Sequence, residues 1–226
     1  MNNSPLHLWK AFCEEQGVIN DSVALFDMDT YGNVRVKEIG RENKRAILAR
    51  SKEMEGLIRQ KCSLLIEDWA SGDHRFDGLL YIMHTIEGEQ IIPYYIGKAE
   101  TIGKGIGNLS ANIKGIESDT SKFARWGDNY AYHIGDLSAV VLPDHNQKYI
   151  QPKYISWADQ LFEEYPSHHP KLKKPIYFWT KAWSSEETGI WKAFGPTKLT
   201  FLEYLLIGVA SSSYPNTLLN REGKNR

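Results

Sequence analysis

Two tyrosines on neighbouring segments of the chain are the first residues whose type and spacing suit chemistry. Tyr81 and Tyr95 lie in two apolar, β-prone runs, 79–86 and 91–96, which a short polar loop separates. Such runs predict a β-hairpin, on which two phenols can point to one face and meet. A phenol has a pKa of about 10, and the nearby cation of Lys98 would lower it. Tyr81 is therefore the candidate general base that draws a proton from water, and Tyr95 is its hydrogen-bond partner.

Three residues farther along the chain supply what cutting a phosphodiester still requires. The reaction needs a deprotonated nucleophile, charge stabilisation on phosphorus and help for the leaving oxygen. Arg125 offers a planar fork that matches phosphate oxygens. Glu203 is the only charged residue between Lys198 and Arg221, and a single carboxylate with waters can anchor one Mg²⁺ or Mn²⁺ ion. Asn220 is the candidate support for this site.

Three further polar side chains are candidate substrate-binding residues: Tyr130, His133 and Asn216. Several candidates also have structural explanations. Thr200 and Glu203 have the spacing of a capping box, in which the glutamate reaches back to the start of its helix. A buried structural histidine is the alternative for His133, and turn chemistry is the alternative for Asn216, which follows a proline.

In their order along the chain, the candidate residues resemble the motifs of the GIY-YIG endonuclease superfamily. Leu79-Leu80-Tyr81 is similar to a degenerate GIY, and Tyr95-Ile96-Gly97 is an intact YIG on the second strand of the hairpin. Family members then carry an arginine on a helix, a glutamate on a later helix and an asparagine after a proline. These match Arg125, Glu203 and Asn220, with Asn216 as a second candidate for the last.

The resemblance covers roughly residues 76–226 and implies a metal-dependent endonuclease that hydrolyses DNA phosphodiesters. It implies that Glu203 is the metal ligand, and Lys98 matches a lysine found directly after YIG in some members. The size of the chain, which has no recognisable second DNA-binding module, fits a restriction-type member.

This chain departs from the family pattern at two places. Thirty residues separate Tyr95 from Arg125, so the resemblance requires an insertion across the glycine-rich stretch between them. Members often carry a histidine or tyrosine four residues after the arginine, but this chain has Asn129 there, followed by Tyr130.

The elements that must position these residues follow from hydrophobic periodicity and predict an α+β fold. We expect a small antiparallel-containing β-sheet flanked by helices, formed by residues 76–226, and an N-terminal helical extension, formed by residues 1–75. The expected helices cover residues 6–16, 37–69, 109–116, 155–165 and 199–210. The expected strands cover residues 23–26, 79–86, 91–96, 137–142 and 175–183.

Charge is uneven along the chain, although the formal net charge is −1. Between Arg35 and Lys61, nine Lys or Arg stand against four Glu. The expected long helix is therefore the candidate DNA-facing surface, with a solvated helix face as the equal alternative. We expect no membrane partner, because no apolar run is long enough for a membrane span. We expect a cytoplasmic location, because the first residues form no secretory signal and the only two cysteines, Cys13 and Cys62, have no ligand-like spacing. A two-strand cut would favour a homodimer, since one such site serves one strand.

Two other classes of protein remain as alternatives. Val23–Asp29 resembles the nucleophile strand of the haloacid-dehalogenase phosphatases, and residues 72–77 resemble their later acidic motif. Only 43 residues separate Asp29 from Gly72, which leaves no room for the βαβ units that this family has between the motifs. The third possibility is a catalytically silent GIY-YIG fold that binds nucleic acid or another protein.

Overall fold

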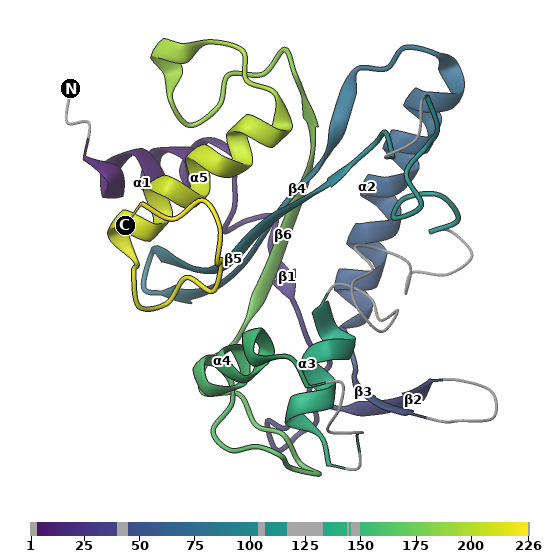
Figure 1. The fold of residues 1–226 in the computed structure, drawn as a ribbon, viewed down its shortest axis with the longest axis vertical. Coiled ribbons are helices and arrows are strands. Elements are labelled where there is room, and N and C mark those ends of the chain that lie inside the picture. The colour runs from purple at the N-terminus through teal and green to yellow at the C-terminus, as the bar shows by residue number, and fades with distance from the viewer. Residues whose placement is uncertain are drawn as a thin grey trace.

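The computed structural model describes residues 4–39, 45–103, 107–116, 133–143, 145 and 150–225. Within these residues, an antiparallel four-stranded sheet lies between helices on its two faces (Figure 1). The expected α+β class is thereby confirmed. The strands, in their order across the sheet, are β1 (Val23–Ala24), β6 (Tyr177–Ser184), β4 (Phe76–Glu87) and β5 (Gln90–Glu100).

The hairpin of the central strand β4 and the edge strand β5 lies between two cores, which explains why its sequence is apolar. β4 and β5 pair around a tight turn, with Glu87 opposite Gln90. Successive residues of β4 enter two different cores: Leu79 and Tyr81 enter one, and Leu80 enters the other. A strand that is buried on both faces has a continuous apolar run rather than an apolar–polar alternation.

Helices cover both faces of this sheet (Figure 1). One face carries α1 (Pro5–Glu15) and α5 (Leu199–Ser213), with the short 3-10 helix η4 (Lys192–Phe194) just before α5. The core on the other face is formed with α2 (Lys52–Ser71), α3 (Ile134–Val141) and α4 (Pro152–Leu161). Cys13 and Cys62 are free thiols buried in the two separate cores, and burial raises the pKa of Cys62 to about 12. Among the described residues, no helix has the length and apolarity to cross a membrane.

The long helix expected over residues 37–69 is wrong in its first part. That part is a hairpin of β2 (Val36–Ile39) and β3 (Arg45–Leu48), and α2 begins directly after Ser51. The Ser51 side chain accepts the Met54 N–H at 2.9 Å, which caps the first turn and fixes where the helix starts. Among the described basic residues of this region, Lys37 and Arg45 lie in the hairpin and Lys52, Arg59 and Lys61 lie in α2, so they do not share one helix face.

Two further expectations are wrong. The strand expected over residues 137–142 is absent: residues 137–141 belong to α3, whose eight residues are all buried, and Leu142 is its C-cap. A short run that is apolar on every side does not distinguish a buried strand from a buried helix. The helix expected over residues 109–116 is absent: residues 111–116 form successive turns, in which Gly115 has a left-handed backbone conformation. The remaining expected strands and helices are present, with α4 starting at Pro152 and ending at Leu161.

The segment before residue 76 shares both cores with the rest of the chain. β1 pairs with β6, and α1 packs against α5. The Trp9 ring of α1 lies 6.5 Å from that of Tyr214 at the end of α5, and the Phe12 ring lies 6.5 Å from that of Trp183. The N-terminal residues therefore help to fix the position of α5, which carries Glu203.

Candidate functional site

One pocket collects five of the residues that the sequence singles out. Its volume is about 530 Å³, and it lies between β5, the inner side of α5 and the segment that follows α5. The predicted site residues that line it are Tyr81, Tyr95, Lys98, Glu203 and Asn220. These residues come from β4, β5, α5 and the chain after α5, so only the folded sheet with its covering helix brings them together.

The hairpin geometry explains the tyrosine pair and the glycine of the YIG sequence. The rings of Tyr81 and Tyr95 stack with 6.3 Å between their centroids and 27° between their planes. Tyr81 pairs across the hairpin with Gly97, and its ring lies over the glycine backbone. A Cβ at position 97 would stand 2.5 Å from the Tyr81 ring. Glycine is needed here because any side chain would displace the phenol.

The electrostatics of Tyr95 differ from the sequence prediction. Burial raises the pKa of the Tyr95 phenol above its ordinary value, and the carboxylates of Glu203 and Glu222 raise it further. The expected lowering by Lys98 is not found for Tyr95. Lys98 forms an ion pair with Glu100. Tyr95 therefore stays protonated at neutral pH and is able to donate a hydrogen bond.

Glu203 contributes a half-buried carboxylate to the pocket. Its carboxylate makes no hydrogen bond or ion pair with any part of the chain that the structure describes. Burial raises its pKa from the ordinary 4.5 to about 7; Lys98 opposes this shift, and Glu100 and Glu222 add to it. The capping-box alternative is wrong, because the N-cap of α5 is Lys198 and the Thr200 hydroxyl donates to Glu100 at 2.8 Å.

The surroundings of Glu203 fit a divalent cation. A half-buried carboxylate without a partner, with two other carboxylates acting on it, is relieved by bound positive charge. No group of three or more His, Cys, Asp or Glu side chains gathers at ligand spacing within the described residues. An ion held at Glu203 would therefore take its remaining ligands from water and substrate oxygens, as Mg²⁺ often does.

The structure separates the two asparagine candidates. Asn220 is buried and bridges to the backbone of Ile96: its amide donates to the carbonyl at 2.8 Å, and its oxygen accepts the N–H at 3.0 Å. These two hydrogen bonds hold the C-terminal segment against β5 beside Tyr95. Asn216 is exposed and does not line the pocket.

The other predicted side chains lie behind the pocket or outside the described residues. His133 is buried, its Nδ1 lies 2.5 Å from the Tyr154 hydroxyl, and its ring packs edge-on against Tyr95 at 5.0 Å. Burial, and then the nearby charge of Lys153, hold the pKa of His133 well below its usual range. His133 thus supports Tyr95 as a neutral side chain and does not line the pocket. Arg125 and Tyr130 fall within 117–132, outside the described residues.

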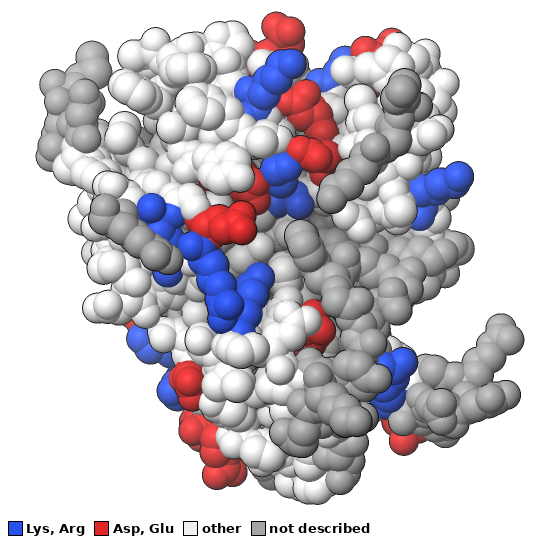
Figure 2. Space-filling view, viewed as in Figure 1, with Lys and Arg blue, Asp and Glu red and all other residues white. Residues whose placement is uncertain are grey.

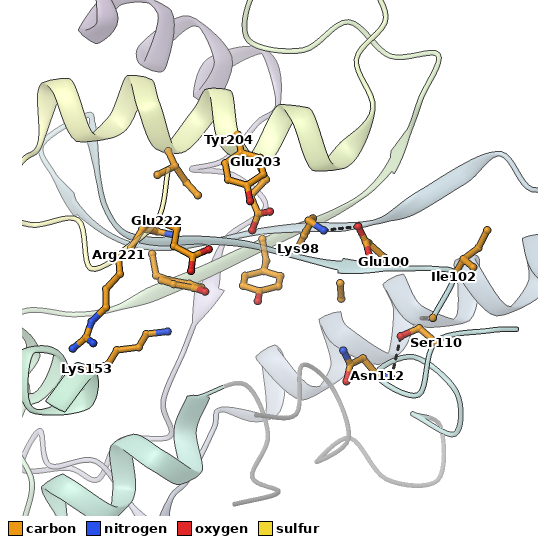
Figure 3. A pocket seen from close by; sticks show the side chains of 16 residues that line it. Lys98, Glu100, Ile102, Ser110, Asn112, Lys153, Glu203, Tyr204, Arg221 and Glu222 are labelled. Carbon is orange, nitrogen blue, oxygen red and sulfur yellow. Dashed lines mark hydrogen bonds and ion pairs between the residues drawn. The ribbon is translucent and has the colours of Figure 1, made fainter. Parts of the chain in front are cut away.

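Four charged residues of the pocket escaped the sequence reasoning. Glu100, Arg221 and Glu222 lie within two positions of predicted residues, so their proximity to Lys98 and Asn220 could have indicated them. Lys153 had no local signal. It reaches the pocket only because α4 packs beside β5 at Tyr95, and Figure 3 shows its side chain near Arg221.

The acidic residues that suggested a phosphatase have structural roles. Asp29 accepts the backbone N–H groups of Tyr31 and Asn33 at 2.8 Å each, and these bonds within the turn, above all those from Asn33, lower its pKa. Asp27 forms a 3.5 Å ion pair with Arg35 on the exposed surface. Neither aspartate lines the pocket.

No protein-family model, curated protein or solved structure matches this chain. The function of the pocket must therefore be inferred from its own residues.

Proposed function

We propose that this protein is a metal-dependent endonuclease that hydrolyses phosphodiester bonds of DNA, as its resemblance to the GIY-YIG superfamily implies. One observation carries the proposal. Five residues that were selected by their type and order in the sequence line one pocket: Tyr81, Tyr95, Lys98, Glu203 and Asn220. If each residue had only a local structural role, nothing would require five of the family's positions to converge on one cavity.

Glu203 is the proposed ligand of a single Mg²⁺ or Mn²⁺ ion. Such an ion, when bound, polarises the phosphate and lowers the pKa of water. A carboxyl with a pKa of about 7 must lose its proton before it can bind a cation. We therefore expect metal affinity to rise with pH through neutrality.

The remaining residues have distinct proposed roles. Tyr81 acts as a phenolate: after its hydroxyl proton has been lost to solvent, its oxygen takes the proton of the attacking water, and the protonated phenol of Tyr95 donates a hydrogen bond beside it. Asn220 is a positioning residue, because it acts by holding the strand that carries Tyr95 and Lys98. The resemblance assigns charge stabilisation on phosphorus to Arg125.

Plasmid cleavage tests the proposal. Wild-type protein with Mg²⁺ should nick or linearise supercoiled DNA, and a chelator should stop the reaction. Tyr81→Phe and Glu203→Gln should each reduce the rate by at least about 100-fold, the usual contribution of a general base or charge-stabilising group. Tyr31→Phe and Glu164→Gln are matched controls on exposed side chains outside the pocket, and they should leave the rate unchanged.

Other outcomes would favour different conclusions. If Tyr81→Phe or Glu203→Gln cuts as fast as the wild type, the assigned chemistry is wrong. If the wild type binds DNA but cuts it with neither Mg²⁺ nor Mn²⁺, the protein is the catalytically silent binding module. Since one pocket serves one strand, linear product from a single encounter would indicate a homodimer, which gel filtration on DNA would check.

A further inference from the structure

Two cations occupy the side of the pocket that lies away from the Lys98–Glu100 ion pair. Figure 3 shows Lys153 and Arg221 together beneath Glu222, on the side of the pocket opposite Lys98 and Glu100. Lys153 belongs to the first turn of α4, and Arg221 follows Asn220 in the C-terminal segment. Neither residue belongs to the motif of the family that the sequence resembles.

Three aromatic rings hold the Lys153 ammonium in place. Its Nζ lies 5.2 Å from the ring centroid of Tyr95, 5.4 Å from that of Tyr154 and 5.3 Å from that of Trp157. Cation–π contacts of this kind fix a lysine without neutralising it. The ammonium therefore reaches the pocket as an ordered positive charge that lies next to one of the two candidate tyrosines.

Lys153 and Arg221 lack a counter-ion in the described part of the chain, where neither forms an ion pair or a side-chain hydrogen bond. Burial lowers the pKa of Lys153, the positive charge of Arg221 lowers it further, and Asp136 and Glu222 act in the opposite direction. Two neighbouring cations, one of them half-buried, repel each other, and an anion bound between them would offset this repulsion. Since Lys153 stands at the start of α4, the helix dipole adds to this preference for an anion.

The charged residues of the pocket form three groups, and Glu222 also acts on Lys153. Lys98 and Glu100 pair with each other, Glu203 and Glu222 are carboxylates near α5, and Lys153 and Arg221 are the cations near α4. Figure 2 shows Lys and Arg side chains gathered beside Asp and Glu on this face, over the region between the C-terminal segment and α4. The carboxylates suit a metal ion, and the two cations near α4 suit the phosphates of a nucleic-acid strand.

We infer that Lys153 and Arg221 form a phosphate site that holds the nucleic-acid backbone next to the phosphodiester that is cut. This inference rests on the proposed function, and it adds two strand-binding residues to it. Arg221 would bind phosphate oxygens through its planar fork, and Lys153 would act as a point charge.

DNA binding without metal tests this site separately from cleavage. The fluorescence anisotropy of a labelled DNA duplex would be measured in chelator over a range of salt concentrations. Lys153→Gln and Arg221→Gln should each weaken binding by about five- to tenfold at low salt, and each should reduce the slope of log affinity against log salt by about 1. Lys153→Arg, which keeps the charge, should keep the wild-type slope.

Two controls separate the possible causes. Lys192→Gln removes an exposed lysine that is ion-paired with Glu15 outside the pocket, and it should leave the slope unchanged. Arg221 is exposed, so its variant tests the site even if Lys153→Gln perturbs the aromatic packing around α4. Urea unfolding of each variant identifies any loss of folded protein.

The inference is overturned if Arg221→Gln and Lys153→Gln bind with the affinity and salt slope of Lys192→Gln, or if the wild type binds no DNA. Cleavage reports on the proposed function independently of this result. A wild type that binds through these cations but cuts nothing supports the phosphate site and refutes the enzyme. A wild type that cuts DNA, together with two variants that bind DNA as tightly as the wild type, supports the enzyme and refutes the phosphate site.

Discussion

Replacing Glu203 with glutamine should stabilise the folded protein at alkaline pH while it removes the proposed metal ligand. The carboxyl is half-buried and has no partner among the described residues, so ionisation is unfavourable in the folded state. Glutamine has nearly the same size but no charge. A residue that lowers stability in its working form is typical of a functional site rather than a structural one.

The size and sign of the effect follow from the pKa of Glu203. In the folded protein this pKa is about 7, against the ordinary 4.5 of an exposed glutamate. Between these values the folded state holds a proton that the unfolded state has lost, so stability falls as pH rises. The full difference corresponds to about 3 kcal/mol, and solvent screening of a partly exposed carboxyl reduces this to about 1–3 kcal/mol. The cost of the charge is absent below about pH 4.5 and complete above about pH 7.

Urea unfolding of wild type and Glu203→Gln at about pH 5 and about pH 8.5 would measure this effect. The advantage of the variant should grow by about 1–3 kcal/mol between the two pH values. Burial lowers the pKa of His84 and of His133, so both are neutral in the folded state of wild type and variant, and their effects cancel in the difference. Added Mg²⁺ should stabilise the wild type at alkaline pH and leave the variant unchanged. A difference that is flat with pH, or that shrinks as pH rises, would refute the assignment of a desolvated, unpaired carboxylate.

Two further substitutions test how the pocket is held together. Asn220→Ala should lower the free energy of unfolding by about 2–4 kcal/mol, because it leaves a buried backbone N–H and C=O of β5 without their partners. Urea unfolding would measure this loss and should show almost no change for the exposed control, Asn216→Ala. Gly97→Ala should cost about 1–3 kcal/mol, because its Cβ would displace the Tyr81 ring, and should slow plasmid cleavage by at least about tenfold. Gly56→Ala, in the interior of α2 with nothing within 4 Å of its Cβ position, should instead stabilise the protein. Equal behaviour of the two glycine variants would contradict the close approach of the phenol to the strand.

The failures of sequence interpretation share a physical origin. Residues 137–142 are apolar because they are buried on every side, and burial alone does not select between strand and helix. The sequence does not reveal that α2 starts directly after Ser51, because a helical spacing of apolar residues continues through the hairpin before it. In both places, packing against distant segments decided the local conformation.

The hairpin that carries Tyr81, Tyr95 and Gly97 was determined by the sequence itself, since two β-prone apolar runs joined by a short polar loop are a local signal. The electrostatics of the site were not determined by the sequence alone. Which helices cover the sheet decides how far Glu203 is buried, and therefore its raised pKa. The packing of α4 beside β5 decides that Lys153 meets Arg221. These are encounters between segments far apart in the chain, and desolvation and Coulomb interactions depend on distances that only the tertiary structure sets.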